Sequence, residues 1–194
     1  MFNDLSTPLT LLETRRSGRP RDLVAPGPDS GQLRRILAIA ARTPDHGKLH
    51  PWRFVHVGAE RRDSFAALLR SAYLAANPEA GRLELEGNER FARQAPELVV
   101  ALSCPVVPHK IPLWEQQLSC GAACMNLLHA AHATGFAAGW VTGWAAYSEA
   151  VRAAFATGEH DRVAGFIFIG TPGAELEERP RPALEEVAST WDSA

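Results

Sequence analysis

Apolar residues recur with the spacing i, i+3, i+4, i+7 over 33–41 and 65–73, which predicts two amphipathic helices. The stretch 114–134 is apolar on most faces, so it predicts a long buried helix that Gly135 closes. Near the start of the chain, Thr7 followed by Pro8 is typical of a helix N-cap and first turn. That helix is expected to run through Leu9 and Leu12 to Arg16.

Short apolar runs predict strands at 52–57, 98–103 and 163–169, and 136–142 fits either a short strand or a loop. Ser30 can cap one helix, and Ser148 with Glu149 can begin another that ends at Gly158. Prolines and glycines predict a loop over 17–30. The tail from 171 to 194 is rich in proline and glutamate and has too few apolar residues to fold alone. The pattern therefore favours an α+β or α/β protein with a small sheet under helices.

Composition narrows the class of protein. The chain has 194 residues, 46% of them hydrophobic and 22% charged, which suits a single globular domain spanning 1–194. A formal net charge of −2 argues against nucleic acid and anionic membrane surfaces as partners. The N-terminus lacks the pattern of a signal peptide, and three cysteines are too few for a disulfide framework. We therefore expect a cytoplasmic protein.

Arginines gather at 15–19, where the sequence is Arg15-Arg16-Ser17-Gly18-Arg19. Guanidinium groups bind phosphate through paired hydrogen bonds, and a serine hydroxyl adds a short donor. A solvated helix end, where cations suit the helix dipole, explains the same charges. From the charges alone both interpretations stay open.

Two further segments carry polar or aromatic groups. His46 and His50 have the spacing of metal ligands on a helix, but the prolines and glycine around them predict a turn, so no metal site is expected. Such a turn can offer polar groups to another ligand. Trp140 and Trp144 lie among glycines and could stack on a flat ligand or fill the core. Cys120 and Cys124 share a face of the long helix, where core packing is favoured over metal binding or thiol chemistry.

Taken in order, these segments resemble the nitroreductase family of FMN-dependent oxidoreductases, and most closely its YdjA-like branch of NAD(P)H nitroreductases. The likeness spans about residues 9 to 187. The residues that carry it are Arg15-Arg16-Ser17 with Arg19, Arg42-Thr43-Pro44-Asp45-His46, Pro51-Trp52, His109-Lys110-Ile111-Pro112, Trp114-Glu115-Gln116, Gly121, Asn126, Ala130, Gly135-Phe136, Gly139-Trp140 and Gly170-Thr171-Pro172.

The resemblance implies an α+β fold with a central, mostly antiparallel sheet flanked by helices. It also implies a homodimer whose interface holds two FMN molecules, with the tail of about 172–194 packing on the partner subunit. Hydride would pass from NADH or NADPH to the flavin and on to a small-molecule acceptor such as a nitroaromatic or a quinone. No catalytic side chain is required for that transfer.

The resemblance assigns the FMN contacts residue by residue. Arg15, Arg16, Ser17 and Arg19 match the phosphate and ribityl contacts, and Arg181 matches a basic C-terminal phosphate contact. Arg42 and His46 match contacts that the other subunit supplies. Trp140, Val141 and Thr142 match the segment along the flavin, and 130–135 matches a stretch associated with the nicotinamide cofactor.

The chain departs from the branch pattern with Val141 in place of arginine and His50 in place of glutamine. It also has Lys48 where many members of the wider family have asparagine. We expect these changes to affect the preference for an acceptor more than the binding of the flavin. Two other functions stay open. One is an FMN-binding sensor or store without turnover, and the other is a related flavin chemistry such as reductive dehalogenation.

Overall fold

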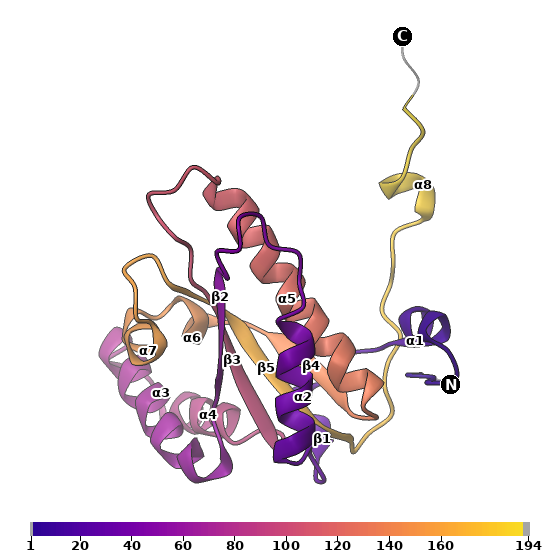
Figure 1. Cartoon of the computed structure of the whole chain (residues 1–194). Coiled ribbons are helices and arrows are strands. Elements are labelled where there is room, and N and C mark those ends of the chain that lie inside the picture. Colours follow the sequence, from indigo (N-terminus) through magenta and orange to yellow (C-terminus); the bar gives the residue numbers. More distant parts are fainter. Residues whose placement is uncertain (1, 192–194) are drawn as a thin grey trace.

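The computed structural model describes residues 2–191, and its centre is a five-stranded sheet (Figure 1). Strands β2, β3, β5 and β1 are neighbours in that order, and β4 also pairs with β5. Every pair is antiparallel. The strands are β1 (Leu23–Val24), β2 (Trp52–His56), β3 (Glu97–Ser103), β4 (Ala137–Val141) and β5 (Arg162–Pro172).

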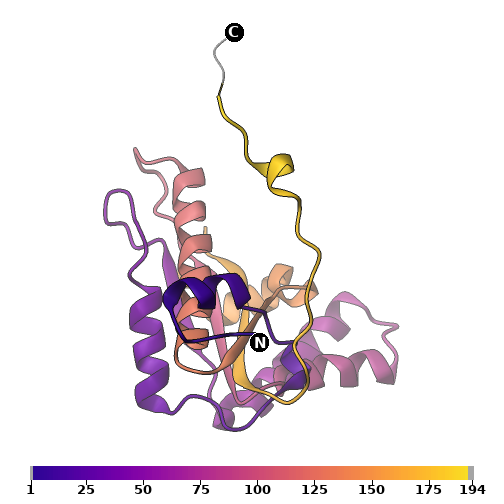
Figure 2. The ribbon, with the colours of Figure 1, turned by 90° about the vertical axis from the view of Figure 1, so that its right-hand side faces the viewer.

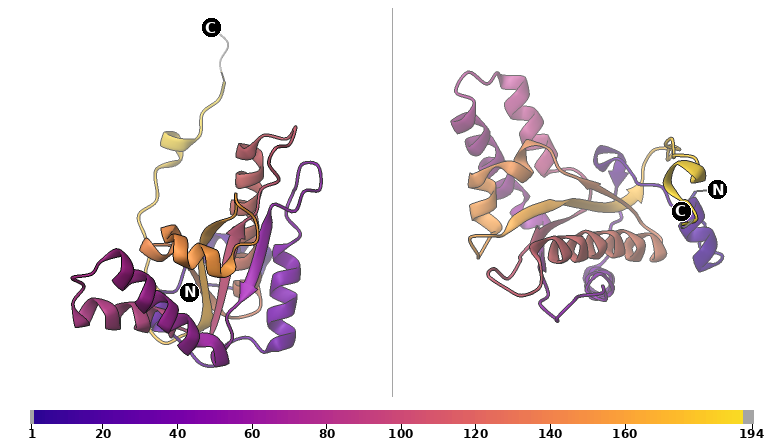
Figure 3. Two further views of the ribbon diagram at one scale, coloured as in Figure 1. Left: turned by 90° about the vertical axis from the view of Figure 1, so that its left-hand side faces the viewer. Right: turned by 90° about the horizontal axis from the view of Figure 1, so that it is seen from above.

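Helices cover both faces of the sheet (Figure 3). Helices α2 and α5 lie on one face, and α3, α4, α6 and α7 lie on the other. The helices are α1 (Pro8–Thr14), α2 (Ser30–Ala40), α3 (Arg62–Ala76), α4 (Arg82–Ala92), α5 (Leu113–Ala133), α6 (Trp144–Tyr147), α7 (Glu149–Phe155) and α8 (Leu184–Val187), with short 3-10 turns at Pro20–Asp22 and Ala59–Arg61.

Alternation along the two central strands builds a core on each side. Val99 and Ile167 pack under α2 and α5, whereas Val100 and Phe166 pack under α3 and α4. Side chains of successive strand residues point to opposite faces, so strands covered on both sides must be apolar throughout. This accounts for the continuous apolar run of β5. Cys120 and Cys124 are buried in the core beneath α5, as predicted.

The α+β class and the antiparallel sheet are confirmed, together with the helices predicted from 33–41, 65–73 and 114–134. The short strand offered as one interpretation of 136–142 forms as β4. The sequence did not predict α4 or α6, and the expected loop over 17–30 contains the 3-10 turn Pro20–Asp22 and strand β1.

Three predicted helix boundaries are wrong. Helix α1 ends at Thr14 rather than running to Arg16, because Arg15 is extended and the side chain of Asn3 accepts the Arg16 N–H. Asp29, not Ser30, is the N-cap of α2, and its carboxylate accepts the Gln32 N–H. Helix α7 ends at Phe155 rather than Gly158. There the Asp161 carboxylate accepts the N–H groups of residues 157 and 158, which draws them into a turn.

Beyond β5 the chain contacts the segment that follows α1, through Arg16 and Arg19, and then extends away from the sheet and its helices (Figure 2). Leu184, Val187 and Trp191 in this tail are 69%, 67% and 87% exposed. Large apolar side chains in water are unfavourable, so the tail has an apolar surface that this single chain does not cover. Among residues 2–191, no helix has both the length and the apolar character needed to cross a membrane.

Candidate functional site

The segment after α1 is held against β4 by close backbone contact. The Gly18 N–H donates to the Ala138 carbonyl at 3.1 Å. A Cβ atom on Gly139 would lie 2.3 Å from the Gly18 carbonyl oxygen, so glycine is required for this approach. The contact places Ser17 and Arg19 beside the strand that carries Trp140. The structure thus brings together two of the segments that the sequence analysis singled out.

Five arginines surround this segment and form what we call the arginine cluster, which consists of Arg15, Arg16, Arg19, Arg179 and Arg181. Burial lowers the pKa of Arg15, and the positive charges of Arg181, Arg16 and Arg179 lower it further. Arg15 donates to the Ser17 hydroxyl at 3.4 Å and forms no ion pair with any described residue. Gathering like charges is unfavourable unless an anion compensates them, so the cluster is suited to binding an anionic group.

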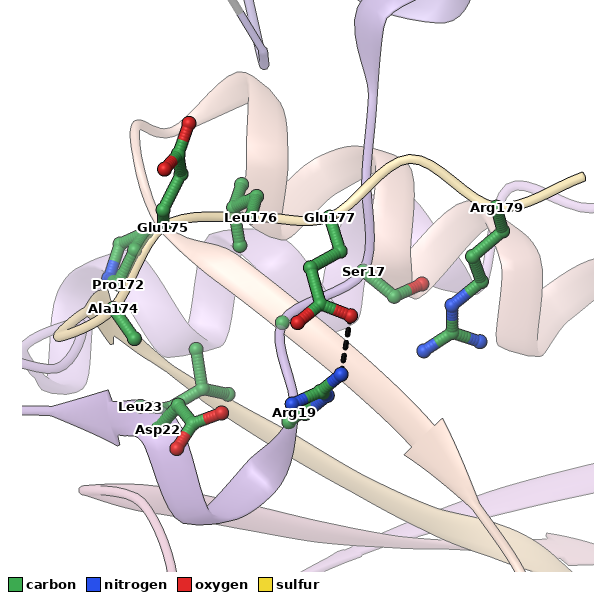
Figure 4. Close-up of a pocket in the computed structure, with 11 residues that line it drawn as sticks. Ser17, Arg19, Asp22, Leu23, Pro172, Ala174, Glu175, Leu176, Glu177 and Arg179 are labelled. Atoms are coloured by element: carbon green, nitrogen blue, oxygen red, sulfur yellow. Dashed lines mark hydrogen bonds and ion pairs between the residues drawn. The ribbon is translucent and has the colours of Figure 1, made fainter.

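Two carboxylates from the tail meet the cluster. Glu178 pairs with Arg16. Glu177 pairs with Arg19, as Figure 4 shows. The Arg16 hydrogen bond is the main cause that lowers the pKa of Glu178. Arg16 Nε is buried and has no hydrogen-bond partner among the described residues. The cluster therefore keeps unused donors even with both glutamates in place.

Two cavities flank the tail where it crosses this region. A cavity of about 50 Å³ contains Ser17, Arg19 and Arg179 in its lining, and Figure 4 shows these side chains beneath the tail. A larger one of about 280 Å³ is lined by the N-terminal residues, the end of α5 and the tail. Pro172, Ala174 and Leu176 line both, so the tail forms their common wall.

Trp140 lies on β4 and is 37% exposed, and its Nε1–H donates to the Ala164 carbonyl at 3.0 Å. A Cβ atom on Gly165 would lie 2.1 Å from that nitrogen, so glycine opens the space for the ring. Val141 packs against the core beneath α3 and α7, whereas Thr142 is exposed. Val141 therefore offers no polar side chain at the end of β4, and only its backbone is available for a polar contact.

The turn that carries Arg42 and His46 is attached to α5 at three points. Asn126 donates to the Thr43 hydroxyl at 2.7 Å, and Ser119 donates to the Pro44 carbonyl at 2.6 Å. The Nδ1 atom of His46 lies 2.7 Å from a carboxylate oxygen of Glu115. Arg42 is exposed.

The structure does not bring His46 to the arginine cluster of the same chain. His46 contacts Glu115 at the start of α5, whereas Arg15 lies close enough to His129 and His132 to lower their pKa values. At 1.5 Å per residue, positions 115 and 129 are about 21 Å apart along the helix. The predicted site residues thus form two groups at opposite ends of α5 (Figure 1).

Several residues of these two groups were not predicted as contacts. Asn3 holds Arg16 in place, Glu177 and Glu178 pair with the cluster, and Glu115 binds His46. The signal that could have pointed to the tail is the charged run at 177–181, where two glutamates precede Arg179 and Arg181. Within residues 2–191 no three potential metal ligands gather in one place.

Comparisons with known proteins agree with this geometry. A family model described as the nitroreductase family matches residues 12–171. A Haemophilus influenzae protein named "Putative NAD(P)H nitroreductase" is 42% identical over 173 residues, which cover 88% of this chain and 91% of that protein. The Escherichia coli K12 protein named "Putative NAD(P)H nitroreductase YdjA" is 37% identical over 164 residues, covering 84% and 87%. The structure of NfnB, described as an FMN and NADPH-dependent nitroreductase from Sphigopyxis sp. strain HMH, is similar with a TM-score of 0.75, 20% identity and coverage of 96% and 99%.

Proposed function

Because this chain belongs to the nitroreductase family, a family of oxidoreductases, we propose that it binds FMN and transfers hydride from NADH or NADPH to an acceptor. A nitroaromatic or a quinone is the acceptor class that the family membership favours. The name of NfnB, a fold neighbour that uses FMN and NADPH, supports the choice of cofactor and reductant.

The arginine cluster is the observation that carries the proposal. FMN ends in a single phosphate, and Arg15, Ser17 and Arg181 offer donors for one terminal phosphate. The buried, unpartnered Nε of Arg16 adds a donor that the described part of the chain leaves unused. The chain has no G-x-G-x-x-G fingerprint for the diphosphate of a dinucleotide. The residues present therefore fit FMN better than FAD.

The segment along β4 suits the flat part of the same ligand. Trp140, Val141 and Thr142 come directly after Gly139 in the sequence. The close contact between Gly139 and Gly18 therefore places them beside the segment that carries Ser17 and Arg19. When bound, FMN supplies the redox chemistry. The protein's part is then to hold the phosphate, to offer backbone donors near Thr142 and to leave room for a flat acceptor. Since hydride transfer to a flavin needs no protein acid or base, the site requires no catalytic dyad.

A homodimer would complete the site. Large apolar side chains are exposed at the start of α5, where the exposed fractions are 45% for Leu113, 67% for Trp114 and 53% for Leu118. Helix α1 adds Leu9 at 64% and Leu12 at 56%. Exposed apolar patches of this kind mark protein interfaces. If two copies of α5 pack antiparallel about a twofold axis, the start of one helix meets the end of the other. Arg42 and His46 of one subunit would then approach the arginine cluster of its partner.

The tail of about 172–194 belongs to the same proposal. Its exposed Leu184, Val187 and Trp191 need a covering surface, and a partner subunit supplies one. We treat 1–194 as one domain, with this tail as an arm toward the partner.

The decisive experiment is the visible spectrum of the purified protein before and after anaerobic addition of NADH or NADPH. We expect a yellow protein with about one FMN per chain that is bleached by either nicotinamide and recovers its colour with a quinone. Acceptor and reductant would use the flavin in turn, so initial rates should give parallel lines in double-reciprocal plots. A yellow protein that no nicotinamide bleaches would instead indicate a flavin sensor or store. A colourless protein that does not take up FMN would contradict the proposal.

A further inference from the structure

Helix α5 carries a line of polar side chains that hold the turn at 42–50. Glu115, Ser119 and Asn126 are four and seven residues apart, so they lie on one face of the helix. Each contacts a different residue of the turn, at His46, Pro44 and Thr43 respectively. The turn is thus fixed along its length, and its position depends on side chains of α5.

The backbone of this turn adopts conformations that non-glycine residues rarely use. Lys48 and His50 have φ angles of 57° and 50°, next to Gly47 at 83°. Asp45 stabilises the turn by accepting the His50 N–H at 2.7 Å. A Cβ atom on Gly47 would lie 2.3 Å from Ile111 Cδ1, so the neighbouring loop also packs closely against it. Such conformations persist only where the surroundings enforce them, and they cluster at functional sites.

The contact between His46 and Glu115 determines which ring nitrogen of His46 is available. A carboxylate can only accept a hydrogen bond, so Nδ1, at 2.7 Å from Glu115, carries a proton. The hydrogen bond at one ring nitrogen fixes the tautomer and leaves the other nitrogen for a ligand. The His46 side chain is 69% exposed in the single chain, so most of its ring is open to a ligand or a partner subunit.

We propose that Glu115 is a positioning residue that holds His46 as the Nδ1–H tautomer and directs its unprotonated Nε2, a hydrogen-bond acceptor, toward a hydroxyl or N–H donor of FMN bound by the partner subunit. This inference rests on the proposed function for its ligand, whereas the tautomer follows from the contact within one chain. Glu115 itself does not touch the flavin. It acts through His46, in the way that a carboxylate orients a metal-ligating or catalytic histidine.

A second histidine–glutamate pair provides an internal control. His56 on β2 lies 2.5 Å from Glu97 on β3, but the contact is made through Nε2. His56 should therefore carry the opposite tautomer to His46. Glu97→Ala is the matched control for Glu115→Ala, because it removes the carboxylate from the same type of pair away from the proposed flavin site.

Two-bond ¹H–¹⁵N correlation spectra of the imidazole rings test the tautomer directly. They are recorded at about pH 9, well above the ordinary histidine pKa of about 6.5. We expect Nδ1–H for His46, assigned through His46→Gln, and Nε2–H for His56. Glu115→Ala should convert His46 mainly to the Nε2–H form that histidine prefers in water. Nε2–H at His46 in the wild type, or no change in Glu115→Ala, would overturn the assignment.

Titration of the apoprotein with FMN tests the consequence for the ligand. His46→Ala and Glu115→Ala should each weaken FMN binding about threefold to tenfold, the range for one hydrogen bond. The double variant should bind FMN as His46→Ala does, because Glu115 acts only through His46. Losses that multiply in the double variant would refute the positioning role. A wild-type protein that takes up no FMN would refute the proposed function, while the tautomer spectra would still decide the structural part.

Discussion

Arg15 and Arg16 are adjacent in the sequence, but their guanidinium groups differ in whether they already form an ion pair. Arg16 is paired with Glu178, whereas Arg15 forms no ion pair within residues 2–191. Binding a phosphate costs Arg16 an existing contact, so its net contribution is smaller. We predict that Arg15→Ala weakens FMN binding by about 1.5–3 kcal/mol, the scale for hydrogen bonds to charged groups, and that Arg16→Ala weakens it by less.

Fluorescence titration of the apoproteins with FMN measures both losses. Arg82→Ala is the control, since Arg82 pairs with Glu86 on the exposed side of α4. If the wild type, Arg15→Ala and Arg16→Ala bind FMN with equal affinity, the arginine cluster does not bind the FMN phosphate.

His132 is fully buried near the end of α5, and burial together with the charge of Arg15 lowers its pKa to about 4. In the unfolded chain the same imidazole titrates near 6.5, so between these values the unfolded state binds a proton that the folded state does not. We predict that the free energy of unfolding falls by about 3 kcal/mol from this group as the pH drops from 6.5 to 4. Above pH 6.5 the contribution is constant.

The measurement is denaturant unfolding of the wild type and His132→Gln across this pH range at one protein concentration. The difference between the two should shrink steadily as the pH falls, because only the wild type has the buried imidazole. His160→Gln, a substitution of an exposed histidine, should keep the wild-type dependence. A difference that does not vary with pH would show that His132 takes up its proton equally well in the folded state.

At the level of elements, the tail segment with Glu177 and Glu178 competes with a phosphate for the same arginines. Ion pairs with exposed glutamates are weak, so removing both carboxylates should tighten FMN binding only modestly, by about threefold to tenfold. The matched control is Glu185→Ala with Glu186→Ala, which removes the same charge from α8. Weaker binding in the Glu177→Ala, Glu178→Ala variant would mean that these pairs hold the tail in its binding position.

The sequence predicted elements whose signals are local. The Thr7–Pro8 cap and the apolar runs of α5 and β5 are set by neighbouring residues. Helix α4 was missed because few of its residues are apolar, with only Leu85 and Ala92 buried, and its position depends on packing against α3. Asp29 and Ser30 are both good N-caps, so sequence alone could not decide between them.

The candidate site shows the same division between local and long-range signals. The arginines at 15–19 were recognisable because they are consecutive. Their partners at 177 and 178 could not be recognised, because they lie about 160 residues further along the chain and no periodic pattern links them to the arginines. The separation of His46 from Arg15 also depends on the length and direction of α5, and local sequence patterns do not reveal it. Only the resemblance hinted at it, because it assigned His46 to the FMN site of the partner subunit.

At the level of the whole molecule, the distance between the two groups of site residues makes the shared site testable by complementation. One variant carries Arg15→Glu, and the other carries Arg42→Glu with His46→Glu. Both are unfolded, mixed equally and refolded with FMN. If the site is shared, a mixed dimer has one site with all defects and one intact site. Random pairing makes about half of the dimers mixed, so roughly a quarter of the wild-type activity should return under twofold symmetry. If each site lies within one chain, every site keeps a defect, and no activity returns although native mass spectrometry shows mixed dimers.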